Sequence, residues 1–145
     1  MEIYQQIVQL APKSRGFHLV TGELLRQLPG LARFTAGLAH FQLLHTSASL
    51  ALNENADPDV RHDMELIFNT MVPEQQHGLR HTLEGSDDMS AHAKSAIIGT
   101  QLSIPVRNRA FLLGTWQGIY LCEHRNHGGP RQIAVTILGE TAKRA

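Results

Sequence analysis

Residues 34–65 constrain the fold most, because a long extended run is followed at once by a clear helix start. The run FTAGLAHFQLLHTSASLALN, residues 34–53, is apolar and ends in polar turn residues, which is typical of strands. Asp57 can then accept hydrogen bonds from first-turn amides. Pro58 suits the first helical position, where its missing N–H leaves no hydrogen bond unmade. We therefore expect extended structure through residue 53 and a helix that begins at Pro58.

Two main helices are predicted in the middle of the chain. Apolar side chains recur at helical spacing after Pro58, on one side of the helix: Val60, Met64, Ile67, Phe68 and Met71. A second, shorter helix over 91–99 has Ser90 as its candidate cap, and Gly99 can close it. Between the two lies a polar stretch, residues 73–89, that is too long for a mere connector and is typical of a functional or disordered loop.

Strand patterns occupy both ends of the chain. The N-terminal part gives a strand over 2–10, then a short strand and a short helix for which Thr21 is a candidate cap. Near the C-terminus, extended runs over 100–106 and 110–124 are joined by a tight turn at RNR, and a last strand follows over 131–139. Strands at both ends with helices between them predict a single α+β domain over 1–145. Its sheet is expected to be mostly antiparallel and packed with two main helices.

Composition narrows the partners and the compartment. The 13 basic side chains equal the 13 acidic ones, and a formally neutral chain lacks the basic stripe that non-specific nucleic-acid binding requires. Cys122 is the only cysteine, which excludes a Cys-rich zinc site and fits a reducing cytoplasm. No apolar run approaches the ~20 residues that span a bilayer. We expect a cytoplasmic protein that binds neither nucleic acid nor membrane.

Three histidines share a setting that suits a metal site. His45, His81 and His92 each lie at the end of an element or in a polar loop, beside small hydroxylated or acidic residues. Three imidazoles that converge with one position open form a catalytic type of zinc site. Their spacing gives no direct signature, so a solvated loop histidine stays the alternative for each. His40 and His62 are predicted to be framework and surface residues.

Several polar residues accompany these histidines. If HTSAS is extended, His45 and Ser47 share a face, which suits a polar pocket or, equally, an exposed edge strand. Glu54 lies in a turn that does not require a glutamate, and Asp63 borders the apolar helix face. Glu123 ends an apolar strand, a common place for a pocket carboxylate. In GGPR, Arg131 offers a fork-shaped cation suited to phosphate or carboxylate.

Three segments together resemble the YjbQ family, also designated UPF0047: LLHTSASLALNENADPDVRHDME, EGSDDMSAHAKSAIIGTQLSIPV and GTWQGIYLCEHRNHGGPR. They occur in order over nearly the whole chain. The resemblance implies a small α+β fold that forms a homotrimer, with a polar pocket near a subunit interface. It also implies metal binding through histidines that match His45, His81 and His92, and a weak thiamine-phosphate synthase activity.

The chain departs from the family pattern in two places. The family often has Asn where this chain has Met89, so no ligand is expected there. The family usually runs from a glutamate to Gly-Pro-Arg through a short aromatic-Asp link. Here Glu123 reaches Gly129 through HRNHG, and whether His124 or His127 replaces the missing aspartate is left open.

The combined expectation is a trimeric metal-binding enzyme that acts on a phosphorylated small molecule. The expected metal is zinc, or magnesium with a diphosphate substrate, and its expected ligands are His45, His81 and His92. The candidates for proton transfer are Glu54, Asp63 and Glu123. The candidates for substrate binding are Ser47, Asn53, Gln117 and Arg131. The alternatives are a metal-dependent hydrolase and a non-catalytic metabolite-binding trimer.

Overall fold

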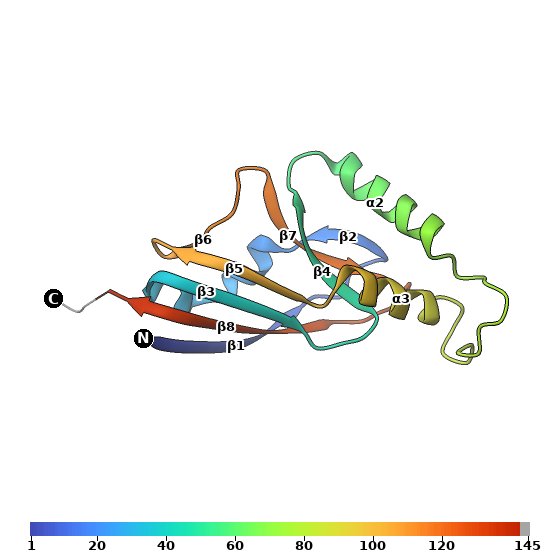
Figure 1. Ribbon diagram of the computed structural model, residues 1–145, viewed down its shortest axis with the longest axis horizontal. Coiled ribbons are helices and arrows are strands. Elements are labelled where there is room, and N and C mark those ends of the chain that lie inside the picture. Colours follow the sequence, from blue (N-terminus) through green and yellow to red (C-terminus); the bar gives the residue numbers. More distant parts are fainter. Residues whose placement is uncertain (143–145) are drawn as a thin grey trace.

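The computed structural model describes residues 1–142, which form two antiparallel sheets and three α-helices (Figure 1). The larger sheet has the strand order β1 (Glu2–Leu10), β8 (Arg131–Thr141), β3 (Phe34–Leu43), β5 (Gln101–Arg107) and β6 (Ala110–Phe111). The smaller sheet has the order β2 (Gly16–Leu19), β7 (Gln117–Glu123) and β4 (Ala48–Glu54). The helices are α1 (Thr21–Arg26), the 3-10 turn η1 (Pro29–Arg33), α2 (Pro58–Met71) and α3 (Asp88–Ile98). The predicted α+β class and antiparallel pairing are confirmed.

One apolar core joins the two sheets. Alternate residues of β8 and β3 are fully or almost fully buried, as period-2 strands with one face on a core require. They pack with residues of the smaller sheet such as Leu50 of β4 and Leu121 of β7 in the same cluster. The buried positions of β8 and β3 are Ile133, Val135, Ile137, Ala39, Phe41 and Leu43.

The predicted extended run over 34–53 is two strands of different sheets. The amide of Leu44 still donates to the carbonyl of Gln132 in the larger sheet, whereas Ala48 already pairs with Glu123 in the smaller one. Residues 44–47 therefore form the corner at which the chain changes sheets. The stretch over 110–124 divides in the same way, because residues 112–116 separate β6 from β7. The turn at RNR is confirmed, with positive φ at Asn108 and Arg109.

The start of α2 is confirmed, since Asp57 accepts a hydrogen bond of 2.8 Å from the Asp59 amide. The apolar side of α2 is less buried than predicted. Met64 and Phe68 pack near Phe17 of β2. Met71 is 61% exposed, because α2 packs against the outer surface of the small sheet. Within residues 1–142, no helix has the length and apolar character needed to cross a membrane.

Two predicted caps are wrong. Helix α3 begins at Asp88, so Ser90 lies inside its first turn and donates to the Asp87 carbonyl instead of capping. Thr21 does not cap α1, because its hydroxyl accepts a hydrogen bond from the Ile119 amide and so ties the helix start to β7. Gly99 does end α3, with φ +101, as predicted.

Candidate metal centre

Three side chains converge at the start of α3: His81, Asp88 and His92. Their candidate ligand atoms all lie within 4.8 Å of one another. Asp88 Oδ2 is 2.6 Å from His81 Nε2 and 2.9 Å from His92 Nε2. The loop before α3 brings in His81, while Asp88 and His92 are one helical turn apart and so share a side of α3. Two of the three predicted metal ligands are thus brought together with a carboxylate.

The ring of His92 is held by the corner between the sheets. Its Nδ1 lies 2.8 Å from the carbonyl oxygen of Thr46. A carbonyl only accepts, so Nδ1 carries the proton and donates it to Thr46. With Nδ1 committed to Thr46, Nε2 is the ring atom that faces Asp88, 2.9 Å from Oδ2, where a metal ion could take the place of the proton that the two groups share. A backbone carbonyl that fixes the tautomer in this way is a recurring feature behind metal-ligating histidines.

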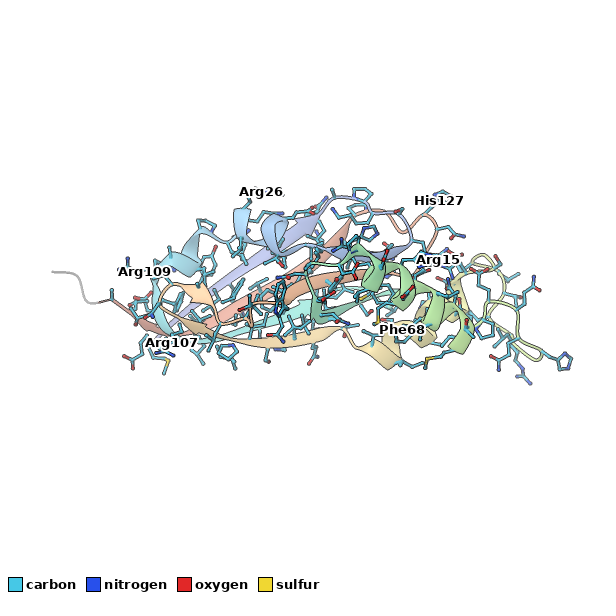
Figure 2. All side chains as sticks on the ribbon, turned by 90° about the horizontal axis from the view of Figure 1, so that it is seen from above. Arg15, Arg26, Phe68, Arg107, Arg109 and His127 are labelled. Atoms are coloured by element: carbon cyan, nitrogen blue, oxygen red, sulfur yellow. The ribbon has the colours of Figure 1, made fainter. Side chains whose placement is uncertain are left out.

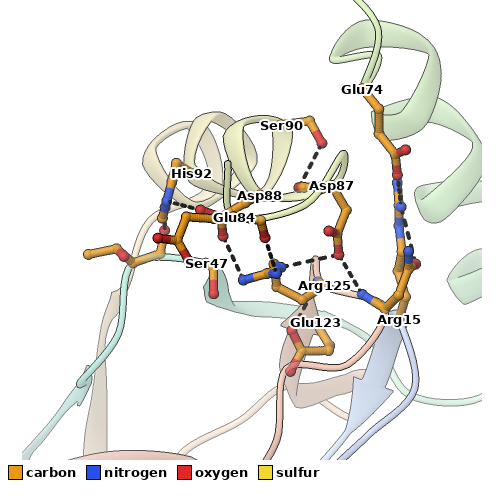
Figure 3. Close-up of polar contacts among 12 residues, drawn as sticks. Arg15, Ser47, Glu74, Glu84, Asp87, Asp88, Ser90, His92, Glu123 and Arg125 are labelled. Carbon is orange, nitrogen blue, oxygen red and sulfur yellow. Dashed lines mark hydrogen bonds and ion pairs between the residues drawn. The ribbon is translucent and has the colours of Figure 1, made fainter. Parts of the chain in front are cut away.

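Asp88 is ionised and nearly buried, with only 4% of its surface exposed. Burial alone would raise its pKa. The hydrogen bond with His81 and the positive charges of His92 and Arg125 outweigh burial and lower the pKa of Asp88 below its ordinary value. Its second oxygen, Oδ1, accepts a hydrogen bond of 2.7 Å from Arg125 Nη1 (Figure 3). The carboxylate therefore keeps Oδ2 for the two imidazoles.

The donor set fits a catalytic type of zinc site. Two imidazole nitrogens and one carboxylate oxygen leave a fourth tetrahedral position for water or substrate, as in zinc hydrolases. The side chains of His81 and His92 are 43% and 30% exposed, so a ligand can approach from solvent. Magnesium prefers an all-oxygen octahedral set and fits these nitrogen donors less well. The ligand chemistry therefore favours zinc.

His45 lies outside this group. Its Nδ1 accepts a hydrogen bond of 3.2 Å from the Ser47 amide and is 3.0 Å from Ser47 Oγ. An amide only donates, so Nδ1 is unprotonated and the neutral ring carries its proton on Nε2. Metal binding through Nε2 would force a proton onto Nδ1, against the Ser47 N–H. The structure therefore presents His45 as a hydrogen-bond donor beside the three candidate ligands.

A cavity of about 870 Å³ connects His45 with the metal group, since His45 and His92 both line it. Burial, followed by the positive charge of Arg131, lowers the pKa of His45, so the ring is neutral at physiological pH. With Nδ1 occupied, the Nε2–H of His45 is the atom available to a ligand in the cavity. His81 lines a second cavity, of about 500 Å³, formed by the loop that carries it.

Ser47, Glu123 and Arg131 form a buried polar cluster beneath the corner, with 0%, 0% and 2% of their surfaces exposed. Arg131 donates to both oxygens of Glu123, at 2.8 and 2.6 Å, and to Ser47 Oγ at 3.0 Å. Glu123 Oε2 also accepts from the Arg125 amide. Both oxygens of Glu123 are thus occupied, and the carboxylate balances a buried cation. This ion-pair role differs from the proton-transfer role predicted for Glu123.

The packing around this cluster explains why residue 128 is a glycine. A Cβ atom at Gly128 would lie 2.3 Å from Glu123 Oε1 and 2.6 Å from Arg131 Nη2, closer than real contacts allow. The backbone at Gly128 can pass only because it has no side chain.

The structure does not bring Asn53, Glu54, Gln117 or Asp63 to the metal group. Glu54 pairs with Gln117, whereas Ala48 pairs with Glu123 at the other end of the same two strands. Six residues along a strand correspond to roughly 20 Å. Asn53 adjoins Glu54 and accepts from its amide at 2.8 Å. Asp63 is exposed on α2, hydrogen-bonded to His62. Alternation along a strand predicts the face of a side chain but not its distance from a site.

The two histidines of HRNHG, whose roles the sequence did not decide, lie in different environments. His127 is exposed, and Figure 2 shows it pointing outward. His124 is 1% exposed, and its Nε2 lies 2.8 Å from Ser49 Oγ. Burial, then the charges of Lys94, Arg15 and Arg131, lowers the pKa of His124 to about 3. Neither histidine belongs to the group of His81, Asp88 and His92, and His124 is part of the interior.

Sequence reasoning missed three residues of this region. Asp88 could have been found, because the four-residue spacing of Asp88 and His92 places both on one helix side. Arg125 had no such signal, since it reaches Asp88 from 37 residues away in sequence. The buried Lys94, whose Nζ donates to Asn69 Oδ1 at 2.7 Å, was also missed, because it is embedded in an otherwise ordinary helix pattern.

Comparisons of the sequence with known proteins give one consistent family. The family model described as "UPF0047 protein YjbQ-like" matches residues 6–140. UPF0047 protein YjbQ of Escherichia coli O157:H7 is 54% identical over 137 residues, which cover 94% of this chain and 99% of that protein. A UPF0047 protein of Synechocystis is 39% identical, with 94% of this chain and 92% of that protein covered.

Solved structures agree in fold. A YbjQ-like protein of unknown function from Sulfolobus solfataricus superposes with a TM-score of 0.82 at 22% identity, covering 96% of this chain and 99% of that one. A hypothetical protein from Aeropyrum pernix gives 0.80 at 28% identity, covering 97% and 100%. An uncharacterised YjbQ/UPF0047 protein from Clostridium acetobutylicum gives 0.78 at 29% identity, covering 92% and 99%. The chain is a member of the UPF0047 family of YjbQ-like proteins.

Proposed function

We propose that the protein is a cytoplasmic zinc-dependent enzyme that acts on a phosphorylated small molecule. Its metal ligands are His81, Asp88 and His92. The observation that carries the proposal is the convergence of three donors around Asp88 Oδ2, with the tautomer of His92 fixed by the Thr46 carbonyl. A salt-bridged surface cluster would not need a ring held from behind in this way.

A zinc ion held by these three side chains would supply Lewis-acid chemistry at the position that they leave open. The substrate lies in the cavity that His45 and His92 share. His45 donates its Nε2–H to a substrate oxygen, where it stabilises developing negative charge. Arg131 and His45 also line a smaller opening of about 190 Å³, and the Nε2–H of His45 is a hydrogen-bond donor there for an anionic, phosphorylated ligand.

Two reaction classes use these groups. A thiamine-phosphate synthase reaction joins a pyrimidine diphosphate to a thiazole phosphate and expels pyrophosphate, and a cation beside the leaving group stabilises its charge. A metal-dependent hydrolase would instead deliver an oxygen nucleophile to a phosphoester or amide. The cavity and the hydrogen-bond donor His45 serve both.

Metal analysis of purified, tag-free protein, combined with turnover assays, tests the proposal. We expect about one zinc per chain, lost in His92→Gln and retained in His62→Gln, whose histidine is exposed on α2 and lies outside the group. Turnover of the synthase substrates or of a phosphoester panel should fall with the metal. Zinc-free wild-type protein would sink the metal site, and tight ligand binding without turnover would favour the metabolite-binding alternative.

The same proposal includes a homotrimer. An apolar row crosses the outer face of the larger sheet, where Ile3 pairs with Leu138 and Leu138 pairs with Leu38. These side chains are 67%, 45% and 47% exposed. A contiguous exposed apolar row favours association. Native mass spectrometry tests this, since a monomer at micromolar concentration would contradict it.

A further inference from the structure

We infer that Arg125 is a positioning residue of the metal group, which holds Asp88 so that one chosen oxygen faces the metal. The inference rests on the proposed zinc site and goes beyond it. Arg125 lies in the segment HRNHG, which follows directly after β7. It touches no candidate donor atom directly, so it acts through Asp88.

The guanidinium of Arg125 gathers three groups at the start of α3 (Figure 3). Nη1 donates to Asp88 Oδ1 at 2.7 Å, and Nε donates to Asp87 Oδ2 at 3.1 Å. Nη2 donates to the carbonyl of Glu84 at 2.9 Å, in the loop that also carries His81. One planar side chain therefore ties the helix that carries Asp88 to the loop that carries His81. A lysine, with a single nitrogen on a flexible stem, could not reproduce this fork.

Because of this contact, the two carboxylate oxygens of Asp88 have different partners. Oδ1 is occupied by Arg125, and Oδ2 faces the two imidazoles. Without the guanidinium, the carboxylate could turn about its Cβ–Cγ bond and present either oxygen, and the loop with His81 would lose one of its ties. Outer partners of metal ligands fix ligand orientation in this manner.

Arg125 is itself held from the backbone. Its amide donates to Glu123 Oε2 at 3.1 Å, and the next amide, of Asn126, donates to Asp87 Oδ2 at 2.8 Å. Glu123 is the partner of the buried Arg131. A continuous set of charge-assisted hydrogen bonds thus links the cation at the smaller opening to the carboxylate of the metal group.

Charge alone predicts the opposite effect of removing Arg125. A cation close to a zinc ion repels it, so loss of the guanidinium would strengthen zinc binding if electrostatics decided the outcome. Loss of positioning would weaken it. The direction of the change in zinc affinity therefore separates a positioning role from a charge effect. In a variant that is merely less stable, the molecules that remain folded would bind zinc with the wild-type affinity.

The test measures the zinc affinity of the full-length protein by competition with a chromophoric chelator, and the visible spectrum of the cobalt(II)-loaded protein. The variants are Arg125→Gln and Arg125→Lys. The matched control is Arg15→Gln, because Arg15 also binds two carboxylates, Glu65 and Glu74, but makes no contact with Asp88.

We expect Arg125→Gln to weaken zinc binding by about 10- to 100-fold and to alter the cobalt spectrum. Arg125→Lys should fall between it and the wild type, and Arg15→Gln should match the wild type. Equal or tighter zinc binding in Arg125→Gln, with an unchanged cobalt spectrum, overturns the positioning role while the zinc site stands. Should Arg125→Gln not fold, Arg125→Lys decides by the same criteria. If the wild type binds no zinc, the proposed function fails, and the inference fails with it.

Discussion

Replacing Glu123 by glutamine tests whether this carboxylate supports the fold or transfers protons. Glu123 is 0% exposed and Arg131 is 2% exposed, and the guanidinium donates to both carboxylate oxygens. Glutamine keeps the shape and one acceptor but removes the charge. Arg131 would then be a buried cation without a counterion.

The expected loss is large compared with the total stability. Removing one partner of a buried ion pair costs about 3–5 kcal/mol, because the remaining charge stays desolvated. A domain of this kind has a free energy of unfolding of about 5–15 kcal/mol. Glu123→Gln should therefore lose a fifth or more of the stability. Glu123→Gln combined with Arg131→Met should regain at least half of the loss, because no unpaired charge is left.

Urea denaturation followed by circular dichroism, at one fixed protein concentration, measures this difference. Zinc content of the folded variant serves as a second readout, and it should be retained because Glu123 is not a proposed ligand. A loss below about 1 kcal/mol together with abolished turnover would refute the reasoning. That result would return Glu123 to the role of a catalytic proton carrier.

Three further predictions follow from single side chains. The pKa of His124 near 3 lies below its unfolded value of about 6.5, so unfolding takes up a proton at any pH between these two values. The free energy of unfolding therefore falls by about 1.4 kcal/mol for each pH unit of acidification in this range. Urea titrations should show that the stability advantage of the wild type over His124→Gln shrinks toward acid pH, and parallel curves would contradict this. Gly128→Ala places a Cβ against Glu123 Oε1 and should cost about 1–3 kcal/mol by urea denaturation, whereas an unchanged midpoint would show that the segment relaxes freely. His45→Gln should reduce turnover by about 10²- to 10⁴-fold with zinc content unchanged, and loss of zinc would restore His45 as a ligand.

The sequence predicted features of the fold that depend on local chemistry. Asp57 and Pro58 start α2, and Gly99 ends α3, because caps act within a few residues of the backbone they satisfy. The corner at residues 44–47 could not be predicted in this way. Whether residues 34–53 form one strand or two depends on which distant strands, β8 or β7, offer hydrogen-bond partners.

The same limit applies to the candidate site, where some residue roles follow from the sequence and others depend on tertiary contacts. His81 and His92 were predicted as ligands and lie together, but His45 turns its lone pair to the Ser47 amide, a contact that no spacing reveals. Glu54 shares strand β4 with the corner, yet the length of that strand carries it roughly 20 Å away. The role of Arg125 depends on the meeting of two loops, which only the tertiary structure supplies.

Anomalous X-ray diffraction at the zinc edge, on crystals grown from tag-free protein with equimolar zinc, tests the metal centre most directly. We predict one strong peak bonded to His81 Nε2, Asp88 Oδ2 and His92 Nε2, and its absence from Asp88→Asn crystals prepared in the same way. A peak bonded to other side chains, or no peak in wild-type protein at equimolar zinc, would contradict the zinc centre on which the proposed function depends.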